Sequence, residues 1–201
     1  MADVDLYLDP VCPFSWVTAR WLRDAAQSTQ TPVVLRQMSL AVLNEGQDPD
    51  DAKQQRMMER STRLGRLFAA AVDERGPDAF EGLYDSVGRR IHVRGDELDT
   101  GAIREALAEN GLEGRLAEAL DDSGFDDAVR RAHQASQEAL GDEAGSPIIA
   151  VGGRAFSGPV LTRAPNGHDG VRLLEAVLTM AAIPEFAELQ RPHQGPPTID
   201  A

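Results

Sequence analysis

Hydrophobic and polar residues alternate at the start of the chain. In the stretch DVDLYLDP, Val4, Leu6 and Leu8 fall on one side. Strict alternation over a few residues is typical of a half-buried strand, and the dipeptide Asp9-Pro10 is a turn signal. The pattern therefore predicts a short first strand that ends at Asp9-Pro10.

The period then changes to that of a helix. From Pro13 onward, Val17, Trp21 and Ala25 share one helical face. Proline suits a first helical turn because its missing N–H would have no helical acceptor there. Residues 31–43 favour a second strand followed by extended chain, so the opening is a β-α-β unit.

Residues 48–141 have a helical pattern throughout. Leu64 and Phe68 lie on one side of the first long stretch, and Gly76-Pro77 interrupts it. Further helical stretches follow, with short connections that contain glycine, such as Asn110-Gly111. We expect about five helices in this segment.

Strand signals return after Gly145. The stretches PIIAV and RAFSG flank Gly152-Gly153, which predicts a tight hairpin, and a last helix follows before Pro184. The order β-α-β, helices, hairpin, helix is that of an α/β thioredoxin fold with a helical insertion. We assign residues 1–47 and 142–201 to the thioredoxin-like domain and residues 48–141 to the insertion.

Composition narrows the class of protein. The chain has 201 residues, 42% of them apolar, which is enough for one large domain or for a small domain that carries an insertion. The formal net charge of −13 would repel a phosphate backbone, so we expect no nucleic-acid partner. We find no signal peptide and no membrane-spanning run, and the four histidines are too scattered for a metal site. One cysteine permits no internal disulfide, which favours a soluble cytoplasmic protein.

The single cysteine, Cys12, is the strongest candidate for chemistry. It lies where the first strand meets the first helix, and the unpaired N–H groups there stabilise a thiolate. We therefore expect Cys12 to be ionised at neutral pH and nucleophilic. Ser15 stands one turn later, where its hydroxyl can donate to the thiolate but cannot attack a mixed disulfide as a thiol would. The alternatives are a buried inert cysteine and a serine that caps its own turn.

Several motifs together resemble one family. DPVCPFSW, MSLAVLNE, RIH, GSPIIAVGG and FSGPVL occur in this order. The chain is similar to the DsbA-like thioredoxin-fold family, and within it to the actinobacterial branch of mycothiol-dependent nitroreductases. Branch members typically carry a CPWC-type motif, whereas this chain has Ser15 in place of the second cysteine.

The resemblance implies roles for particular residues. Cys12 matches the nucleophilic cysteine of the family, and Pro147 matches the cis-proline that faces it. Ser15, which stands in place of the second cysteine, is the third catalytic candidate. The substrate cleft would then include five residues, namely Pro13, Phe14, Asn44, His92 and Ser146. Two of these residues could instead have a purely structural role. Asn44 would then form hydrogen bonds only within a turn, and His92 would only face the C-terminal end of a helix.

The resemblance also implies an activity. It indicates a cytosolic thiol-disulfide oxidoreductase without a metal, which uses a low-molecular-weight thiol (mycothiol or glutathione) to reduce disulfides or nitroaromatic compounds. A monothiol mechanism follows from Ser15. The alternatives are an enzyme like kappa-type glutathione transferase or 2-hydroxychromene-2-carboxylate isomerase, and a non-catalytic redox sensor. The oligomeric state is left open, with a homodimer among the alternatives.

Overall fold

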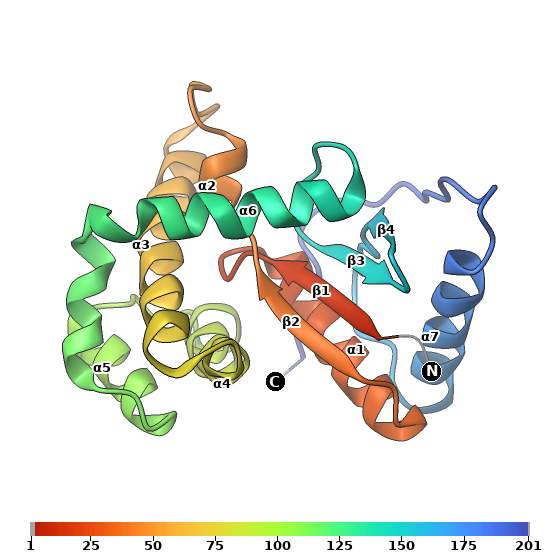
Figure 1. The fold of residues 1–201 in the computed structure, drawn as a ribbon, viewed down its shortest axis with the longest axis horizontal. Helices are drawn as coiled ribbons and strands as arrows, with labels where there is room; N and C mark the ends of the chain where they lie inside the picture. Colours follow the sequence, from red (N-terminus) through yellow and green to blue (C-terminus); the bar gives the residue numbers. More distant parts are fainter. Residues whose placement is uncertain (1–2, 201) are drawn as a thin grey trace.

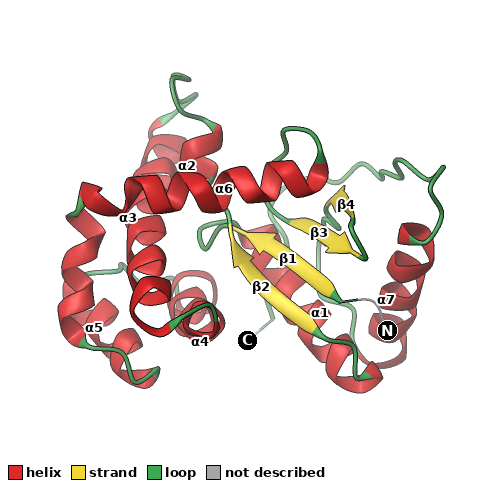
Figure 2. Ribbon diagram, in the orientation of Figure 1, coloured by secondary structure: helices red, strands yellow, loops and turns green. Residues whose placement is uncertain are grey.

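A four-stranded sheet in the order β2-β1-β3-β4 lies between helices (Figures 1 and 2). The computed structural model describes residues 3–200. β1 (Val4–Leu8) pairs in parallel with β2 (Val33–Gln37), and α1 (Pro13–Thr29) connects them. β3 (Ile148–Val151) pairs antiparallel to β1 and continues through a hairpin into β4 (Arg154–Ser157). Segments more than a hundred residues apart thus form one sheet.

The two faces of the sheet bury different residues. Val4, Leu6 and Leu8 lie in the main core, which also contains residues of α1 and of α7 (Gly167–Ala181). Tyr7 points the other way, into a smaller cluster beneath α6 (Asp126–Leu140). This arrangement follows from the period of two along a strand. The predicted first strand, its buried side and the last helix are confirmed.

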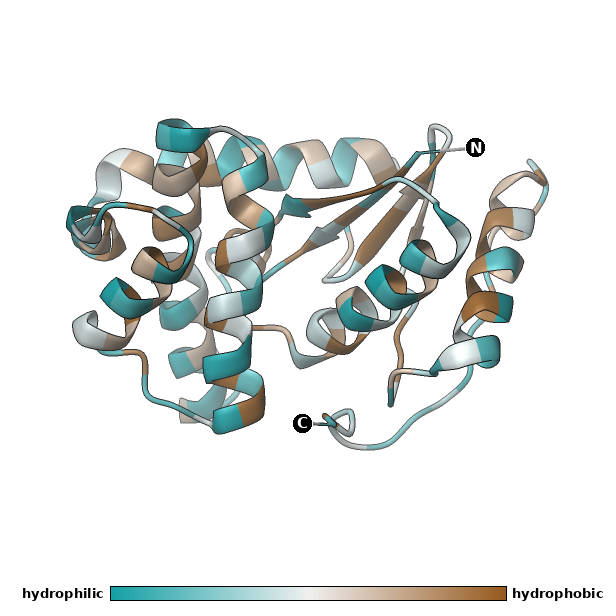
Figure 3. Cartoon of the chain, turned by 90° about the horizontal axis from the view of Figure 1, so that it is seen from below, coloured by the Kyte–Doolittle hydropathy of each residue, from teal (hydrophilic) through white to brown (hydrophobic). Residues whose placement is uncertain are grey.

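The segment between β2 and β3 is helical, as predicted. It contains α2 (Leu40–Leu43), α3 (Ala52–Arg75), α4 (Asp78–Gly88), the π-helix η1 (Arg89–Arg94), α5 (Thr100–Glu109), the 3-10 helices η2 (Gly114–Asp121) and η3 (Ser123–Phe125), and α6. Hydrophobic and hydrophilic residues alternate along these helices (Figure 3). The apolar sides of α3, α4, α5 and η2 join the main core, whereas the end of α6 packs on the smaller cluster.

Local structure differs from the prediction in two places. Residues 40–43 form a short helix rather than extended chain, because the Ser39 hydroxyl caps it by accepting a hydrogen bond from the Val42 N–H at 3.2 Å. The helical segment after Pro77 is α-helical only to Gly88 and continues as a π-helix to Arg94, a change of helix type that the sequence pattern does not predict. The hairpin turn is confirmed, and both of its glycines have a positive φ, 56° at Gly152 and 82° at Gly153.

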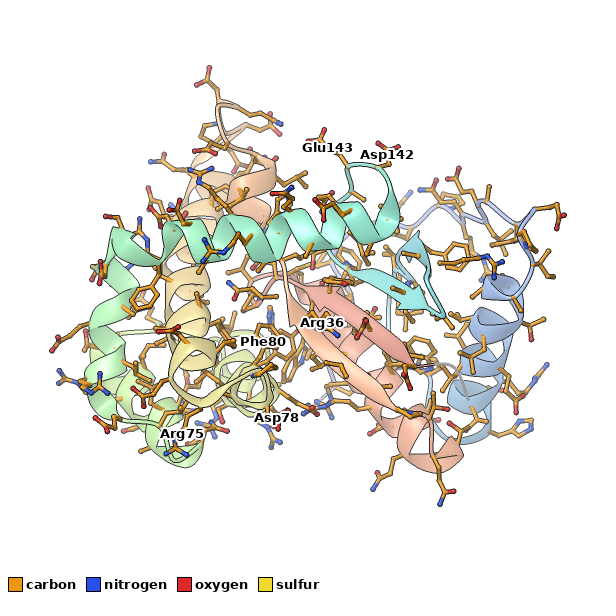
Figure 4. The ribbon with its side chains drawn as sticks, in the orientation of Figure 1. Arg36, Arg75, Asp78, Phe80, Asp142 and Glu143 are labelled. Atoms are coloured by element: carbon orange, nitrogen blue, oxygen red, sulfur yellow. The ribbon has the colours of Figure 1, made fainter. Side chains whose placement is uncertain are left out.

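The helical segment and the sheet share α6, which contacts β2, β3 and β4 as well as α3 (Figure 1). The proposed domain boundaries at residues 48 and 141 therefore stay a prediction. Figure 4 shows Asp142 and Glu143 in the loop that follows α6, where they add to the acidic surface. Within residues 3–200, no helix combines the length and apolarity that crossing a membrane requires.

Candidate active site

Cys12 occupies the N-cap position of α1. Its backbone is extended, with φ −78° and ψ 115°, and Pro13 begins the helix as predicted. The Cys12 N–H donates to the Asp9 carbonyl at 3.1 Å, and the Cys12 carbonyl accepts from the Trp16 N–H at 3.1 Å. Only 6% of the Cys12 surface is exposed. The sulfur is therefore fixed at the helix N-terminus but shielded from solvent.

The structure brings Cys12 and Ser146 together. The Cys12 Sγ lies 3.3 Å from the Ser146 carbonyl oxygen. A carbonyl oxygen only accepts, so the thiol donates and the sulfur carries its proton. The peptide bond between Ser146 and Pro147 is cis, as predicted, and a second cis bond joins Gly158 to Pro159.

The thiolate expected from the sequence is not supported. Burial raises the pKa of Cys12 above its ordinary value, and the negative charge of Asp9 raises it further. Hydrogen bonds from the hydroxyl and N–H of Ser15 and from the N–H of Phe14 lower it, but they are outweighed. The helix N-terminus acts in the predicted direction, whereas loss of hydration acts against it and prevails.

Ser15 is fully buried and its hydroxyl lies 2.5 Å from that of Ser146. The Ser146 hydroxyl also accepts from the Asp9 N–H at 2.8 Å. With that acceptor position filled, the Ser146 proton can point to Ser15, which leaves the Ser15 proton free to point to Cys12. A short chain of hydrogen bonds thus links Asp9, Ser146 and Ser15 and ends at the Cys12 sulfur.

Asp9 is a site residue that the sequence indicated only as the end of a strand. It is 1% exposed. One carboxylate oxygen accepts from the Val11 N–H at 2.9 Å, and the other accepts from the Leu40 N–H at 2.7 Å and the Ser61 hydroxyl at 2.5 Å. Burial raises the pKa of Asp9, against the effect of these hydrogen bonds. Asp9 therefore ties the Cys12 loop to α2 and α3.

His92 approaches the Cys12 loop from η1. Its Nε2 lies 2.8 Å from the Pro10 carbonyl oxygen, so Nε2 carries the proton and donates. Its ring stacks on Trp16 with 5.6 Å between centroids. Burial lowers the pKa of His92 to about 4. His92 is thus a neutral ring that supports the loop two residues before Cys12.

Trp16 connects this loop to α4. Its ring centroid lies 5.9 Å from that of Tyr84, and a Cβ added at Gly88 would lie only 2.3 Å from the Trp16 ring. The Tyr84 hydroxyl is buried and makes no hydrogen bond with the described residues. Burial raises its pKa, and the charges of Cys12 and Asp9 add to this effect. The contacts of Trp16 with His92 and Tyr84 had no signal in the sequence.

Asn44 lies at the C-terminus of α2 and donates from Nδ2 to the Leu40 carbonyl at 2.7 Å. It lines a hollow of about 260 Å³ beside the first turns of α3, and Cys12 does not line this hollow. The structure therefore places Asn44 in a capping contact, and its contact with substrate stays a prediction. Phe14 is instead covered by the chain after α7, because its ring centroid lies 5.0 Å from that of His193.

Two comparisons of the sequence show which proteins the chain is similar to. A family model described as Rv2466c-like, mycothiol-dependent nitroreductase Rv2466c, matches residues 11–191. The uncharacterized protein Rv2286c of Mycobacterium tuberculosis (strain ATCC 25618 / H37Rv) is 30% identical over 197 residues, which cover 96% of this chain and 83% of that protein.

Solved structures share the fold at lower identity. The chain is similar to the probable DsbA oxidoreductase SCO1869 from Streptomyces coelicolor, with 20% identity, a TM-score of 0.59 and coverage of 95% of this chain and 94% of that one. It is also similar to the cytosolic disulfide reductase DsbM from Pseudomonas aeruginosa with GSH, with 20% identity, a TM-score of 0.57 and coverage of 88% and 99%. The fold is therefore DsbA-like.

Proposed function

Because the chain belongs to the Rv2466c-like family of mycothiol-dependent nitroreductases, we propose that it is a thiol-disulfide oxidoreductase that works through one protein thiol. The observation that carries this proposal is the placement of Cys12. The sulfur lies at the start of α1, 3.3 Å from the Ser146 carbonyl, with a hydroxyl at position 15. A low-molecular-weight thiol, mycothiol or glutathione, serves as the co-substrate.

The cycle has two exchange steps. The Cys12 thiolate attacks the small-thiol sulfur of a mixed disulfide between substrate and small thiol, and the substrate leaves as a thiolate that takes up a proton. Cys12 then carries the small thiol in a disulfide. A second small-thiol molecule, as thiolate, attacks the small-thiol sulfur of that disulfide, which releases the Cys12 thiolate and a small-thiol disulfide. Over the two steps the substrate sulfur is reduced to a thiol, and the sulfur of the second small-thiol molecule is oxidised to a disulfide.

The Cys12 proton must leave before the first step. Ser15 and the first N–H groups of α1 stabilise the resulting thiolate, whereas burial and the charge of Asp9 oppose it. A negative charge on Asp9 therefore disfavours the Cys12 thiolate. Loss of the proton also breaks the Cys12 hydrogen bond to Ser146, because a thiolate does not donate.

Two observations support the finer parts of this proposal. The family description names mycothiol and nitroreduction, so nitroaromatic compounds are a second substrate class. The DsbM structure was solved with GSH, which is a thiol of the class proposed here. Both thiols are cytoplasmic reductants, so we place the activity in the cytoplasm.

The test combines mass spectrometry and turnover. The protein is exposed to oxidised mycothiol or oxidised glutathione, its intact mass is measured, and disulfide reduction is assayed for the wild type and Cys12→Ser. We expect one adduct on Cys12 and turnover that is lost in Cys12→Ser. Turnover that survives this change contradicts the proposal and favours a transferase or isomerase, and an adduct without turnover favours a sensor.

A further inference from the structure

A groove of about 680 Å³ lies between α1 and the segment formed by α4 and η1. Its walls carry four arginines, Arg20, Arg23, Arg89 and Arg94, but only two carboxylates, Asp24 and Asp85. The local excess of positive charge is unusual in a chain whose formal net charge is −13.

The arginines differ in their partners. Arg23 pairs with Glu81 at 2.7 Å and shares Asp85 with Arg89. Arg20 and Arg94 make no ion pair with the carboxylates of residues 3–200, and Arg20 donates only to the Asp200 carbonyl at 3.1 Å. Two guanidinium groups in the groove therefore retain unused capacity to bind an anion.

The lining residue nearest to Cys12 in sequence is Trp16, one helical turn further along α1, and Cys12 itself does not line the groove. Trp16, Arg20 and Arg23 follow Cys12 at spacings that share one face of α1. A helix rises 1.5 Å per residue, so Arg20 lies about 12 Å along the axis from Cys12. His92, which is not part of the lining, stacks on Trp16 and donates to the Pro10 carbonyl. The groove thus follows the face of α1 that carries Cys12 at its N-terminus.

The opposite wall has a special backbone. η1 is a π-helix, in which hydrogen bonds join residues five apart, so Arg89 and Arg94 come onto one face. π-helical turns are rare and occur frequently at functional sites. The wall approaches closely because Gly88 leaves room for Trp16.

A second observation points to a binding site. Trp16, which lines the groove, is 1% exposed, and its indole N–H has no hydrogen-bond partner among the described residues. A buried donor without a partner is costly, and such groups occur where function requires them. The guanidinium carbon of Arg20 also lies 5.9 Å from the Trp16 ring centroid. The groove therefore combines an aromatic inner wall with cationic sides.

We propose that this groove binds the oxyanion end, carboxylate or phosphate, of an elongated small molecule whose reactive end reaches Cys12. The inference rests on the proposed function, because it assigns that co-substrate or substrate a charged group at the end remote from its reacting atom. Arg20 and Arg94 would hold the oxyanion, and the Trp16 ring would contact the connecting part.

The binding test uses defined anions. Inorganic pyrophosphate and citrate are titrated into the wild type, Arg20→Gln/Arg94→Gln, Arg94→Gln and the matched control Arg131→Gln by calorimetry at low salt. Arg131 is exposed on α6, away from the groove. We expect at least one anion to bind, at least about tenfold more weakly in the double variant and unchanged in the control. Binding of pyrophosphate alone indicates a phosphate ligand, and binding of citrate alone a carboxylate.

The turnover test compares oxidised glutathione with the neutral bis(2-hydroxyethyl) disulfide, each reduced by the neutral thiol dithiothreitol, so that every turnover yields two thiols and one oxidised dithiothreitol. We expect the ratio of KM for the anionic over the neutral disulfide to rise about tenfold in the double variant and to stay the same in Arg131→Gln. Absence of anion binding, equal weakening by Arg131→Gln, or an unchanged KM ratio overturns the groove proposal. Turnover that persists in Cys12→Ser overturns the proposed function instead, so the two failures are distinguishable.

Discussion

The hydroxyl groups of Ser15 and Ser146 lie 2.5 Å apart although 131 positions separate the two residues. Ser15 stands where a second thiol would resolve a disulfide on Cys12, and Ser146 supplies the carbonyl that accepts from Cys12. The hydroxyl at position 15 is thus fixed by the loop that contacts the nucleophile. This geometry explains how Ser15 replaces a thiol without a gap in the site.

Replacing Ser15 by cysteine should introduce an internal resolving thiol. An intramolecular thiol has a high effective concentration, so Ser15→Cys should expel the small thiol from the Cys12 adduct and form an internal disulfide. We expect the small thiol to be released from the Cys12 adduct without the dependence on added mycothiol or glutathione that this step has in the wild type. The oxidised variant should weigh about 2 Da less than its reduced form, the mass of two hydrogen atoms. Ser15→Ala is the control, and it should keep the wild-type dependence. An unchanged dependence in Ser15→Cys would argue against the monothiol cycle.

Substitutions at Asp9 and at Ser15 should shift the pKa of Cys12 in opposite directions. We expect alkylation by iodoacetamide to rise with pH with a midpoint above the ordinary value of 9.0, because burial raises the pKa. Asp9→Asn removes a negative charge and should lower the midpoint, whereas Ser15→Ala removes a donor and should raise it. Mass spectrometry after timed alkylation measures both shifts. A wild-type midpoint near pH ~7 would show that the helix N-terminus prevails over burial.

His92 should make stability depend on pH. Its pKa is about 4 in the folded protein and about 6.5 when unfolded, so the unfolded state binds an extra proton between these values. Neutral His92 makes its full contribution to the free energy of unfolding above about pH 6.5, and this contribution is lost as the pH falls toward 4. Between pH 7 and 5 we expect a loss of about 2 kcal/mol in the free energy of unfolding from this group.

The variant His92→Gln isolates this effect, because an amide can still donate to the Pro10 carbonyl but does not titrate. Urea unfolding at pH 7 and pH 5 should show a smaller pH dependence in His92→Gln than in the wild type. His168→Gln, at an exposed position of α7, should retain the wild-type dependence. Equal pH dependence in wild type and His92→Gln would contradict the assignment.

The contact between Gly88 and Trp16 can be tested by adding one methyl group. In Gly88→Ala the new Cβ would lie 2.3 Å from a fully packed indole, which cannot move without displacing His92 or Tyr84. We expect a loss of about 1–3 kcal/mol in the free energy of urea unfolding. The control Gly114→Ala meets its nearest atom at 3.7 Å, an ordinary contact, and should cost less. Similar losses in both variants would count against a tight contact.

The elements predicted from the sequence are those with local signals. The period of two predicts β1, Gly152-Gly153 predicts the hairpin, and the helical period predicts α1. The meeting of Asp9 with Ser61 depends on how α3 packs, 52 positions along the chain, and no periodic pattern encodes it.

The ionisation state of Cys12 also depends on contacts that are distant in sequence and that no local pattern encodes. The helix N-terminus is a local feature, but burial depends on every element that covers the sulfur, and burial decides the direction of the pKa shift. The π-helix was not predicted, because residues 89–94 have the composition of an ordinary helix. Ser146 was predicted as a neighbour of Cys12 through the family resemblance rather than from its own surroundings.

The hydrogen bonds of the Asp9 carboxylate determine which segments of the molecule can separate from one another. Its acceptors are satisfied only while the Cys12 loop, Leu40 and Ser61 stay together. A fluctuation that separates α2 or α3 from the sheet would leave a buried charge without donors, so these segments should open as one cooperative unit. The amides of Val11 and Leu40 should therefore exchange with deuterium at similar protection. We therefore expect solvent to reach the buried Cys12 thiol when the helical segment opens as a unit, rather than when the end of α1 frays.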